Sequence, residues 1–424
     1  MRRRVLIVLP SFIHDPVSEA SRSMRAIGAL LASQVDQFEV RALSPSLGSE
    51  MPMTNPRVLL AALGAKVETD ARGAVGRGRP VLRYTAGGIR CSVLDTPATA
   101  DEYWEFRHGE QFNRLYERLL EDYQPDIVFC TGGAPGDVFR RELAHLARAQ
   151  VCMAVHSLGY LHKLAFEHTD NVLFPSRFLR DRYERSIGLA GTYLPTPIHT
   201  ASANAVQPPR DPHSVLFLRP ALSRGLAFVI GIAKSLAGRN SAITLTVGAD
   251  LAGQALFRDF VRRHAGNAGL PALRAISDLS AGTGALAGKA AVLLAPSTDE
   301  NGIALDVAEA MAAGAIPLVS DRGALPEVAV PSGSAELARS TVVPIPAATP
   351  ARPTDLPTPA ETRPWIEALD HLTSDSADSS KHAEGVRSAI ADRAPSRLLD
   401  RYAAYFDRPA GSLPLYVAAG HPAP

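Results

Sequence analysis

The sequence offers little that would mark the protein for a membrane, for nucleic acid or for an oxidising compartment. No apolar run reaches the roughly 20 residues that a transmembrane helix needs, and a formal net charge of +1 gives no bulk attraction to nucleic acid or anionic lipid. The three cysteines form no Cys-x-x-Cys pair, which favours buried thiols over disulfides or a zinc site. The apolar run at 5–10 is too short for a signal peptide, so we expect a cytoplasmic protein.

Two motifs of common enzyme classes are also missing. No Gly-x-Gly-x-x-Gly follows an expected strand and opens a helix, which argues against a Rossmann dehydrogenase. No Asp-x-Asp stands at a suitable strand end, so we expect neither a bound metal nor a cofactor.

What is present is the composition and length of a two-domain α/β protein. A chain of 424 residues, of which 46% are hydrophobic and 21% charged, suggests two globular domains of roughly 200 residues each. Strand and helix patterns alternate along both halves, and this predicts mostly parallel sheets. A hairpin is expected to turn at Gly87-Gly88. The other expected strands are 5–10, 38–43, 125–130, 151–157, 171–176, 214–220, 242–248, 290–297 and 316–320.

The pattern breaks once, in a segment rich in proline and small polar residues that we interpret as a linker. A second irregular segment, 330–362, is rich in Pro, Ala and Thr and is expected at the surface. Helical pattern returns over 382–407. The predicted organisation is an N-terminal domain (1–200), a linker (201–213), a C-terminal domain (214–394) and a terminal helix with its tail (395–424).

The first candidate site element is FLRPALSRG (217–225), an expected strand followed by a short loop and a helix start. Arg219 and Arg224 bracket the loop. Two guanidiniums at such a turn can each donate paired hydrogen bonds to phosphate oxygens, so they would suit a diphosphate. From these residues alone, two solvated surface arginines are the simpler interpretation.

The second element is PSTDENGIALDVAEAMAAGAIP (296–317), where a strand ends and a helix is expected over 301–314. A helix start at the carboxyl end of a strand offers free N–H groups to an anion. The helix is built of small and apolar residues but carries Asp306 and Glu309. Either ligand hydroxyls bind these carboxylates, or the two simply mark a solvent-facing edge.

These stretches resemble the donor domain of GT-B glycosyltransferases, particularly the retaining family 4. That family has Glu-x7-Glu followed by Ala-Met-Ala-x-Gly-x-Pro, and EAMAAGAIP (309–317) matches with one extra residue. The following run, DRGALPEV, and FLRPALSRG also fit, and PDIVFC, VHSLGY and NVLFPSRFLRDRY fall in the expected order. The resemblance implies two Rossmann-like domains facing each other across a cleft, with the C-terminal helix crossing back to the N-terminal domain.

The resemblance also implies roles for individual residues. Glu309 would bind the ribose hydroxyls, Arg219 and Arg224 the diphosphate, and the N–H groups of Gly302 and Ile303 the sugar. The residues implied in catalysis are His156, Glu300, Arg219 and Arg224, and those implied in donor binding are Ser297, Asn301, Gly302, Ile303 and Glu309.

The sequence departs from the family pattern in three places. Counting back from Glu309, the first-Glu position holds Asn301, so either Asn301 replaces the Glu or an extra loop residue lets Glu300 reach the sugar; we favour Glu300. The second Gly of this loop is Ala304. Ser18-Glu19 stands where a Gly-Gly usually follows the first strand.

The function that the resemblance implies is transfer of a hexose from a nucleotide diphosphate sugar, a UDP-sugar by expectation, to an acceptor with retention at the anomeric carbon. We expect a small soluble acceptor and no nucleic-acid partner. The sequence leaves open whether the protein is a monomer or a homodimer. The alternative functions are a GT-B nucleotide-sugar epimerase or hydrolase, and an altered GT-B protein that binds a nucleotide sugar without turnover.

Overall fold

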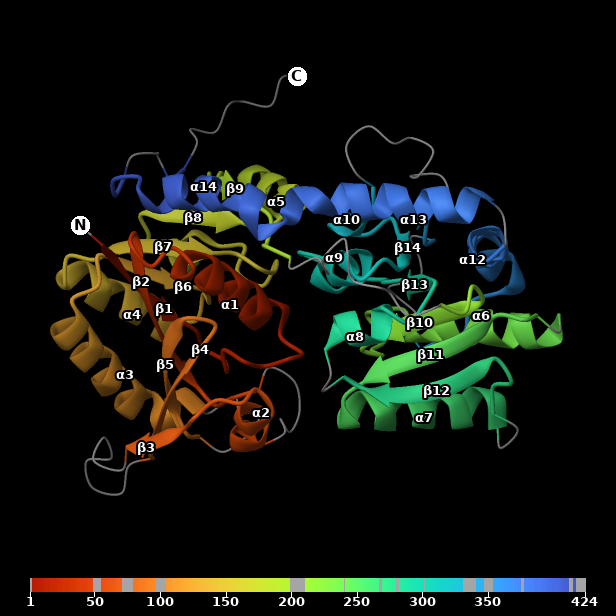
Figure 1. Cartoon of the computed structure of the whole chain (residues 1–424), viewed down its shortest axis with the longest axis horizontal. Coiled ribbons are helices and arrows are strands. Elements are labelled where there is room, and N and C mark those ends of the chain that lie inside the picture. The colour runs from red at the N-terminus through yellow and green to blue at the C-terminus, as the bar shows by residue number, and fades with distance from the viewer. Residues whose placement is uncertain are drawn as a thin grey trace, which may run out of the picture. The chain divides into compact units, whose positions relative to one another are not determined.

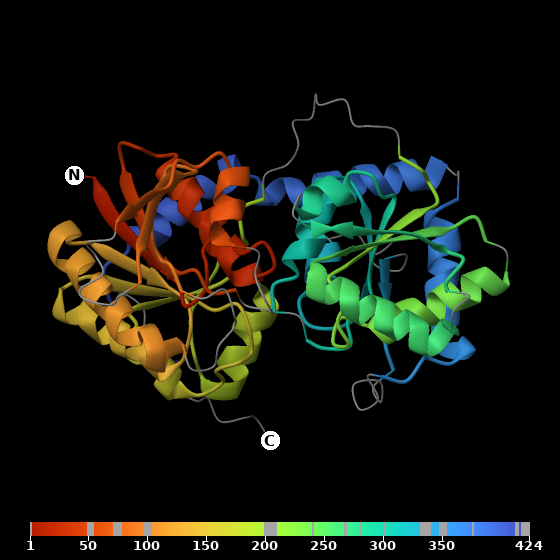
Figure 2. The same cartoon turned by 90° about the horizontal axis from the view of Figure 1, so that it is seen from below.

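The computed structural model divides the chain into two compact units. The N-terminal unit joins Met1–Pro197 to Pro395–Pro424, and the C-terminal unit is Ile198–Ala394. Each unit is a sheet flanked by helices (Figure 1 and Figure 2). The structure describes residues 2–48, 55–70, 79–96, 104–198, 210–239, 241–266, 269–279, 282–300, 302–330, 341–346, 354–374, 377–411 and 415–416. Most of the expected linker, 201–209, therefore lies outside the described residues.

The N-terminal unit is built on a nine-stranded sheet with the order β3-β4-β5-β2-β1-β6-β7-β8-β9. β3, β4 and β5 pair antiparallel, and the strands from β5 to β9 in that order pair in parallel. The predicted hairpin at Gly87-Gly88 is confirmed as the turn between β4 and β5. The strands are β1 (Arg3–Val8), β2 (Phe38–Pro45), β3 (Glu68–Asp70), β4 (Val81–Ala86), β5 (Ile89–Leu94), β6 (Ile127–Cys130), β7 (Gln150–Ala154), β8 (Asn171–Phe174) and β9 (Thr192–Tyr193).

Helices cover this sheet, and they begin where the sequence supplies caps. The hydroxyl of Ser18 accepts from the Ser21 N–H and so caps α1, and the hydroxyl of Ser176 caps α5 in the same way. Ser18 thus serves helix α1 at the place where the family carries Gly-Gly. The helices are α1 (Glu19–Ala32), α2 (Pro56–Ala62), α3 (Trp104–Tyr123), α4 (Pro135–Leu146), η1 (Lys163–Phe166) and α5 (Arg177–Ile187).

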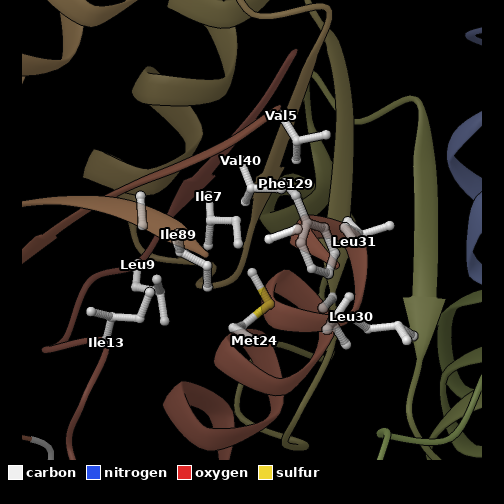
Figure 3. Packing of buried hydrophobic residues seen from close by; sticks show 14 of the residues in the cluster. Val5, Ile7, Leu9, Ile13, Met24, Leu30, Leu31, Val40, Ile89 and Phe129 are labelled. Atoms are coloured by element: carbon white, nitrogen blue, oxygen red, sulfur yellow. The ribbon is translucent and has the colours of Figure 1, made fainter. Parts of the chain in front are cut away.

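The core of the N-terminal unit lies between α1 and the central strands. In Figure 3, Met24 and Leu31 of α1 face strand residues that include Ile7, Ile89 and Phe129. All five side chains are at most 1% exposed. The central strand β1 is apolar and buried from Val5 to Val8, because both faces of a parallel sheet are covered by helices.

The C-terminal helix α14 (Pro395–Phe406) belongs to this N-terminal core. Leu398, Tyr402, Tyr405 and Phe406 are at most 1% exposed and join the same cluster as the strands. The Phe406 ring meets Phe129 of β6 edge-on, with 5.1 Å between centroids. The Tyr402 hydroxyl donates to the Pro195 carbonyl oxygen at 3.0 Å.

The C-terminal unit is built on a parallel six-stranded sheet with the order β12-β11-β10-β13-β14-β15. Helices α6 and α7 lie next to each other along this sheet (Figure 2). The strands are β10 (Ser214–Leu218), β11 (Thr244–Ala249), β12 (Leu273–Asp278), β13 (Val292–Ala295), β14 (Ile316–Ser320) and β15 (Val342–Val343). The helices are α6 (Leu226–Gly238), α7 (Leu251–Ala265), α8 (Thr283–Ala287), α9 (Leu305–Ala312), α10 (Leu325–Ala329), α12 (Pro359–Leu372), α13 (Ala377–Ile390) and η5 (Ala391–Arg393).

Candidate functional site

The strand order places two loops of the C-terminal unit side by side. β10 and β13 are neighbours at the point where the order of the sheet reverses, and both strands run in the same direction. The loop after β10 carries Arg219 and Arg224, and the loop after β13 leads into α9. In open α/β sheets, the carboxyl edge at such a reversal is where ligands bind.

The turn after β10 is tightly built. Arg219 has a left-handed φ of 52°, and its N–H donates to the Gly248 carbonyl oxygen at 2.7 Å. Gly225 has φ of 82° at the start of α6. A Cβ on Gly225 would overlap the Pro296 carbonyl oxygen and lie 2.6 Å from its carbon, so only glycine lets the two loops approach this closely.

Hydroxyl groups of the second loop join it to the first. Ser297 donates to the Ser223 carbonyl oxygen at 3.0 Å, and Thr298 donates to the same oxygen at 3.1 Å. Ser320 of β14 in turn donates to the Ser297 carbonyl oxygen at 2.7 Å. The hydroxyl of Ser297, predicted to bind the donor, thus connects the two loops.

Helix α9 begins later than the sequence indicates. Its first residue is Leu305, not a residue in 301–303, because Ala304 takes a left-handed φ of 49°. That conformation is costly for a residue with a Cβ. It falls at the position where the family pattern has its second Gly. The expectation that the helix starts at 301 is therefore wrong, and local backbone geometry overrides the helical pattern before Leu305.

Asp306, in the first turn of α9, is the centre of the site's electrostatics. It is 6% exposed, so the solvent-facing interpretation is wrong for this residue. One carboxylate oxygen pairs with Arg219, and the other accepts from Arg224 Nη1 at 3.0 Å. Arg219 also lies 3.5 Å from the Thr283 hydroxyl at the start of α8. The surface interpretation is likewise wrong for Arg219, which is 6% exposed.

The remaining predicted donor residues lie around this ion pair in different environments. Ile303 is buried, Gly302 and Glu309 are half-buried, and Glu300 is exposed. Glu309 follows Asp306 by one turn on α9. Asn301 lies outside the described residues, so the choice between Asn301 and Glu300 stays open.

His156, the predicted catalytic histidine, lies in the N-terminal unit just after β7. It is 7% exposed, and its Nδ1 lies 3.2 Å from the hydroxyl of Thr131, which follows the neighbouring strand β6. Burial lowers the pKa of His156 to about 3, so the ring is neutral at pH 7. A neutral ring can orient a hydroxyl but does not carry a proton at that pH.

The loop that carries Thr131 is held in place by a buried arginine of helix α4. Arg141 of α4 is 1% exposed and donates to the carbonyl oxygens of Gly132 at 2.9 Å and Ala165 at 2.6 Å. A buried guanidinium that satisfies several carbonyl oxygens is a rigid support. The sequence singles out the loop TGGAPG (131–136), which begins with Thr131, but not Thr283, whose only signal is a hydroxyl residue at a helix start.

Two buried histidines give a prediction for stability against pH. Burial lowers the pKa of both His14 and His156 to about 3, against about 6.5 in an unfolded chain. Both rings bind a proton only on unfolding as pH falls below 6.5. The free energy of unfolding is therefore not reduced by these two rings above pH 6.5, and it falls progressively as pH decreases from 6.5 toward 3.

The His156→Gln variant should take up to one proton fewer on unfolding below pH 6.5. The slope of its free energy of unfolding against pH should therefore be smaller than that of wild type by up to about 1.4 kcal/mol per pH unit. Urea unfolding of both proteins at pH 7.5, 5.5 and 4.5 measures the difference. His371→Gln, at an exposed residue of α12, is the control and should follow the wild type. Parallel pH profiles for wild type and His156→Gln would contradict the prediction.

Comparison with known proteins places this architecture among the GT-B folds. No family model matches the sequence, and no curated protein matches it. Solved structures do match. Sucrose-phosphate synthase from Thermosynechococcus elongatus is 13% identical, with a TM-score of 0.65 over 96% of this chain and 98% of that one. The catalytic domain of starch synthase IV from Arabidopsis thaliana, solved with ADP and acarbose, is 12% identical, with a TM-score of 0.64 over 95% and 100%.

A third similar structure is the Anabaena protein HepE in complex with UDP and glucose, 11% identical, with a TM-score of 0.60 over 96% of this chain and 99% of that one. Two α/β units with mostly parallel sheets, together with these neighbours, define the fold of this chain as GT-B. Within the part of the chain that the structure describes, we find no helix with the length and apolar character needed to span a bilayer.

Proposed function

We propose that this chain is a nucleotide-sugar-dependent glycosyltransferase. The observation that carries the proposal is the meeting of Arg219 and Arg224 at the carboxyl edge of β10, beside the helix α9 that bears Glu309, in a GT-B fold. Further support comes from the neighbours of known structure, one solved with ADP and another with UDP and glucose.

In the proposed reaction the bond from the anomeric carbon to the diphosphate breaks and a bond to an acceptor oxygen forms. The acceptor's proton passes to the departing phosphate oxygen, so no protein base is needed. Negative charge grows on the diphosphate, and guanidinium groups fixed nearby stabilise it. Arg224, whose side chain is 26% exposed, is the more accessible of the pair.

The other predicted residues have positioning roles in this proposal. Glu309 accepts hydrogen bonds from the ribose hydroxyls, and Gly302 and Ile303 offer N–H groups to the sugar. Glu300 or Asn301 orients the sugar hydroxyls. Ser297 holds the loop that contains these residues through Ser223. His156 keeps the role that the resemblance implies, as a neutral hydrogen-bonding group.

The finer features of the proposal are family 4 membership, retention at the anomeric carbon and a UDP-hexose donor. We further propose a small soluble acceptor, a cytoplasmic location and no metal requirement. Family 4 membership, retention and the UDP-hexose donor rest on the resemblance of 296–328 and FLRPALSRG to family 4, whereas the cytoplasmic location rests on the short apolar run at 5–10. The homodimer remains an alternative to the monomer.

The test is a panel of UDP-, GDP- and dTDP-sugars screened for protection against thermal unfolding, because a ligand that binds the native state raises the Tm. Donors that protect are then incubated with candidate acceptors, and NMR reads the anomeric configuration of the product. Absence of protection by every donor would refute the proposal. Free sugar or an epimer formed from donor alone would indicate a hydrolase or epimerase. Protection without turnover would indicate a binding protein.

Glu309→Ala should remove protection by the donor while leaving the fold intact. Each hydrogen bond to a charged group contributes about 1.5–3 kcal/mol, so losing the ribose contacts should weaken UDP binding by about ten- to a hundred-fold or more. Calorimetric titration with UDP measures the loss. Glu367→Ala, which removes an exposed carboxylate of α12, is the control. Unchanged UDP affinity in Glu309→Ala would defeat the assignment of the ribose site.

A further inference from the structure

We infer that Asp306 is a built-in counter-anion that occupies both guanidiniums of the proposed diphosphate site and competes with the phosphate of a ligand for them. The inference rests on the proposed function, because it concerns how the same site takes its donor. The family motif assigns no role to this residue, and the sequence alone offered ligand hydroxyls or solvent as partners of its carboxylate, not the two arginines. Its position lies between the two glutamate positions of the motif, at the first turn of α9.

The geometry of Asp306 is that of a bound oxyanion. Its two oxygens are divided between two cations: Oδ1 pairs with Arg219 Nη1, and Oδ2 accepts from Arg224 Nη1 at 3.0 Å. A phosphate group would offer oxygens to the same two guanidiniums in the same manner. In the ligand-free chain, Asp306 therefore takes up one Nη1 group on each of the two guanidiniums that a diphosphate would contact.

Burial strengthens the ion pair of Asp306 with Arg219 more than its ion pair with Arg224. The side chains of Arg219 and Asp306 are 5% and 9% exposed, whereas that of Arg224 is 26% exposed. The charges are screened little by water in the buried part of the cluster. A ligand can approach Arg224 first, and the deeper Arg219 remains paired with Asp306 unless the ligand displaces the carboxylate.

The backbone holds the partners in place. Arg219, which forms one of the ion pairs, has a φ of 52°, and Ala304, two residues before Asp306, has a φ of 49°. Such left-handed conformations persist in non-glycine residues only where the surroundings enforce them. Asp306 links the β10 loop to α9, so its charge both stabilises the empty site and repels an incoming phosphate.

The formal charge of the cluster decides the consequence for binding. Two arginines and one aspartate carry a net charge of +1, whereas the two arginines alone would carry +2. The Asp306→Asn substitution keeps the shape of the side chain and one acceptor oxygen but removes the competing charge. A purely structural role of Asp306 would have the opposite result, because misplaced arginines bind phosphate less well.

The experiment compares wild type, Asp306→Asn and Asp299→Asn by calorimetric titration with inorganic pyrophosphate and with UDP. We expect Asp306→Asn to have a lower ligand-free Tm and to bind pyrophosphate about ten-fold more tightly or better, with a steeper salt dependence. Asp299→Asn removes an exposed carboxylate from the same loop and should stay within about two-fold of wild type. Pyrophosphate binding by Asp306→Asn no tighter than by wild type would overturn the inference.

If Asp306→Asn is unfolded in chloride buffer, millimolar pyrophosphate should restore a cooperative unfolding transition, and failure to do so would also count against the inference. A wild type that binds no nucleotide sugar, alongside an Asp306→Asn variant that gains pyrophosphate binding, would refute the glycosyltransferase but not the counter-anion. Sugar transfer by wild type without any gain in the variant would refute only the counter-anion.

Discussion

Gly225→Ala should abolish protection by UDP and lower the Tm of the C-terminal unit. The residue has φ of 82°, and an added Cβ would overlap the carbonyl oxygen of Pro296. The overlapping group is backbone and cannot rotate aside as a flexible side chain would, so the loops after β10 and β13 must separate. Strain of this kind costs about 3 kcal/mol or more. Separation would also move Arg224 relative to α9, so thermal unfolding with and without UDP measures both effects.

Gly238→Ala is the matched control for this substitution. Gly238 ends the same helix, α6, and a Cβ there would meet nothing within 4 Å. Alanine in a helix is favoured over glycine by up to about 1 kcal/mol, so this variant should be as stable as wild type or slightly more so. A Gly225→Ala protein with the wild-type Tm would show that the two loops do not need their close approach.

Phe406→Ala should destabilise the N-terminal unit by about 3–5 kcal/mol, the usual cost of truncating a buried phenylalanine. The ring is fully buried, and it packs edge-on against Phe129 and Tyr405 with centroids 5.1 Å away in each case. The truncation removes the edge-on contact of Phe406 with Phe129 of β6 and leaves a cavity between α14 and the sheet. Urea unfolding followed by far-UV circular dichroism measures the change.

Phe106→Ala on α3 is the control for Phe406→Ala. The Phe106 side chain is 91% exposed, so its truncation should change the free energy of unfolding by no more than about 0.5 kcal/mol. Equal effects of the two substitutions would mean that α14 is not part of the N-terminal core.

The sequence was most informative where one periodicity dominated. The apolar runs at β1, β10 and β14 predicted buried strands, and Gly87-Gly88 predicted a hairpin turn. The short charged helix α5 was harder to detect. α5 reads RFLRDRYERSI, and its best signal was the cap at Ser176 rather than its few apolar residues. The edge strand β12 is only half-buried, so its pattern is weak.

The residues of the candidate site could be singled out from the sequence, but the ion pairs between them could not be predicted. Arg219, Arg224 and α9 were singled out by motif, yet Asp306 lies 82 residues or more from either arginine. A carboxylate on an apolar helix signals that a partner exists but not which one. The late start of α9 was also hidden, because Ala304 favours a helix locally and only tertiary contacts hold it in a left-handed conformation.

The place of α14 has a consequence for how the chain folds during synthesis. Arg3 of β1 bonds to the carbonyl oxygen of Phe406, a sequence separation of 403 residues. The C-terminal unit is continuous in sequence, so it can fold as soon as its last strand and helices have left the ribosome. The N-terminal sheet is translated before the C-terminal unit, yet its core stays incomplete until α14 has left the ribosome. Of the two units, the one whose strands are made earlier is therefore expected to complete its fold later.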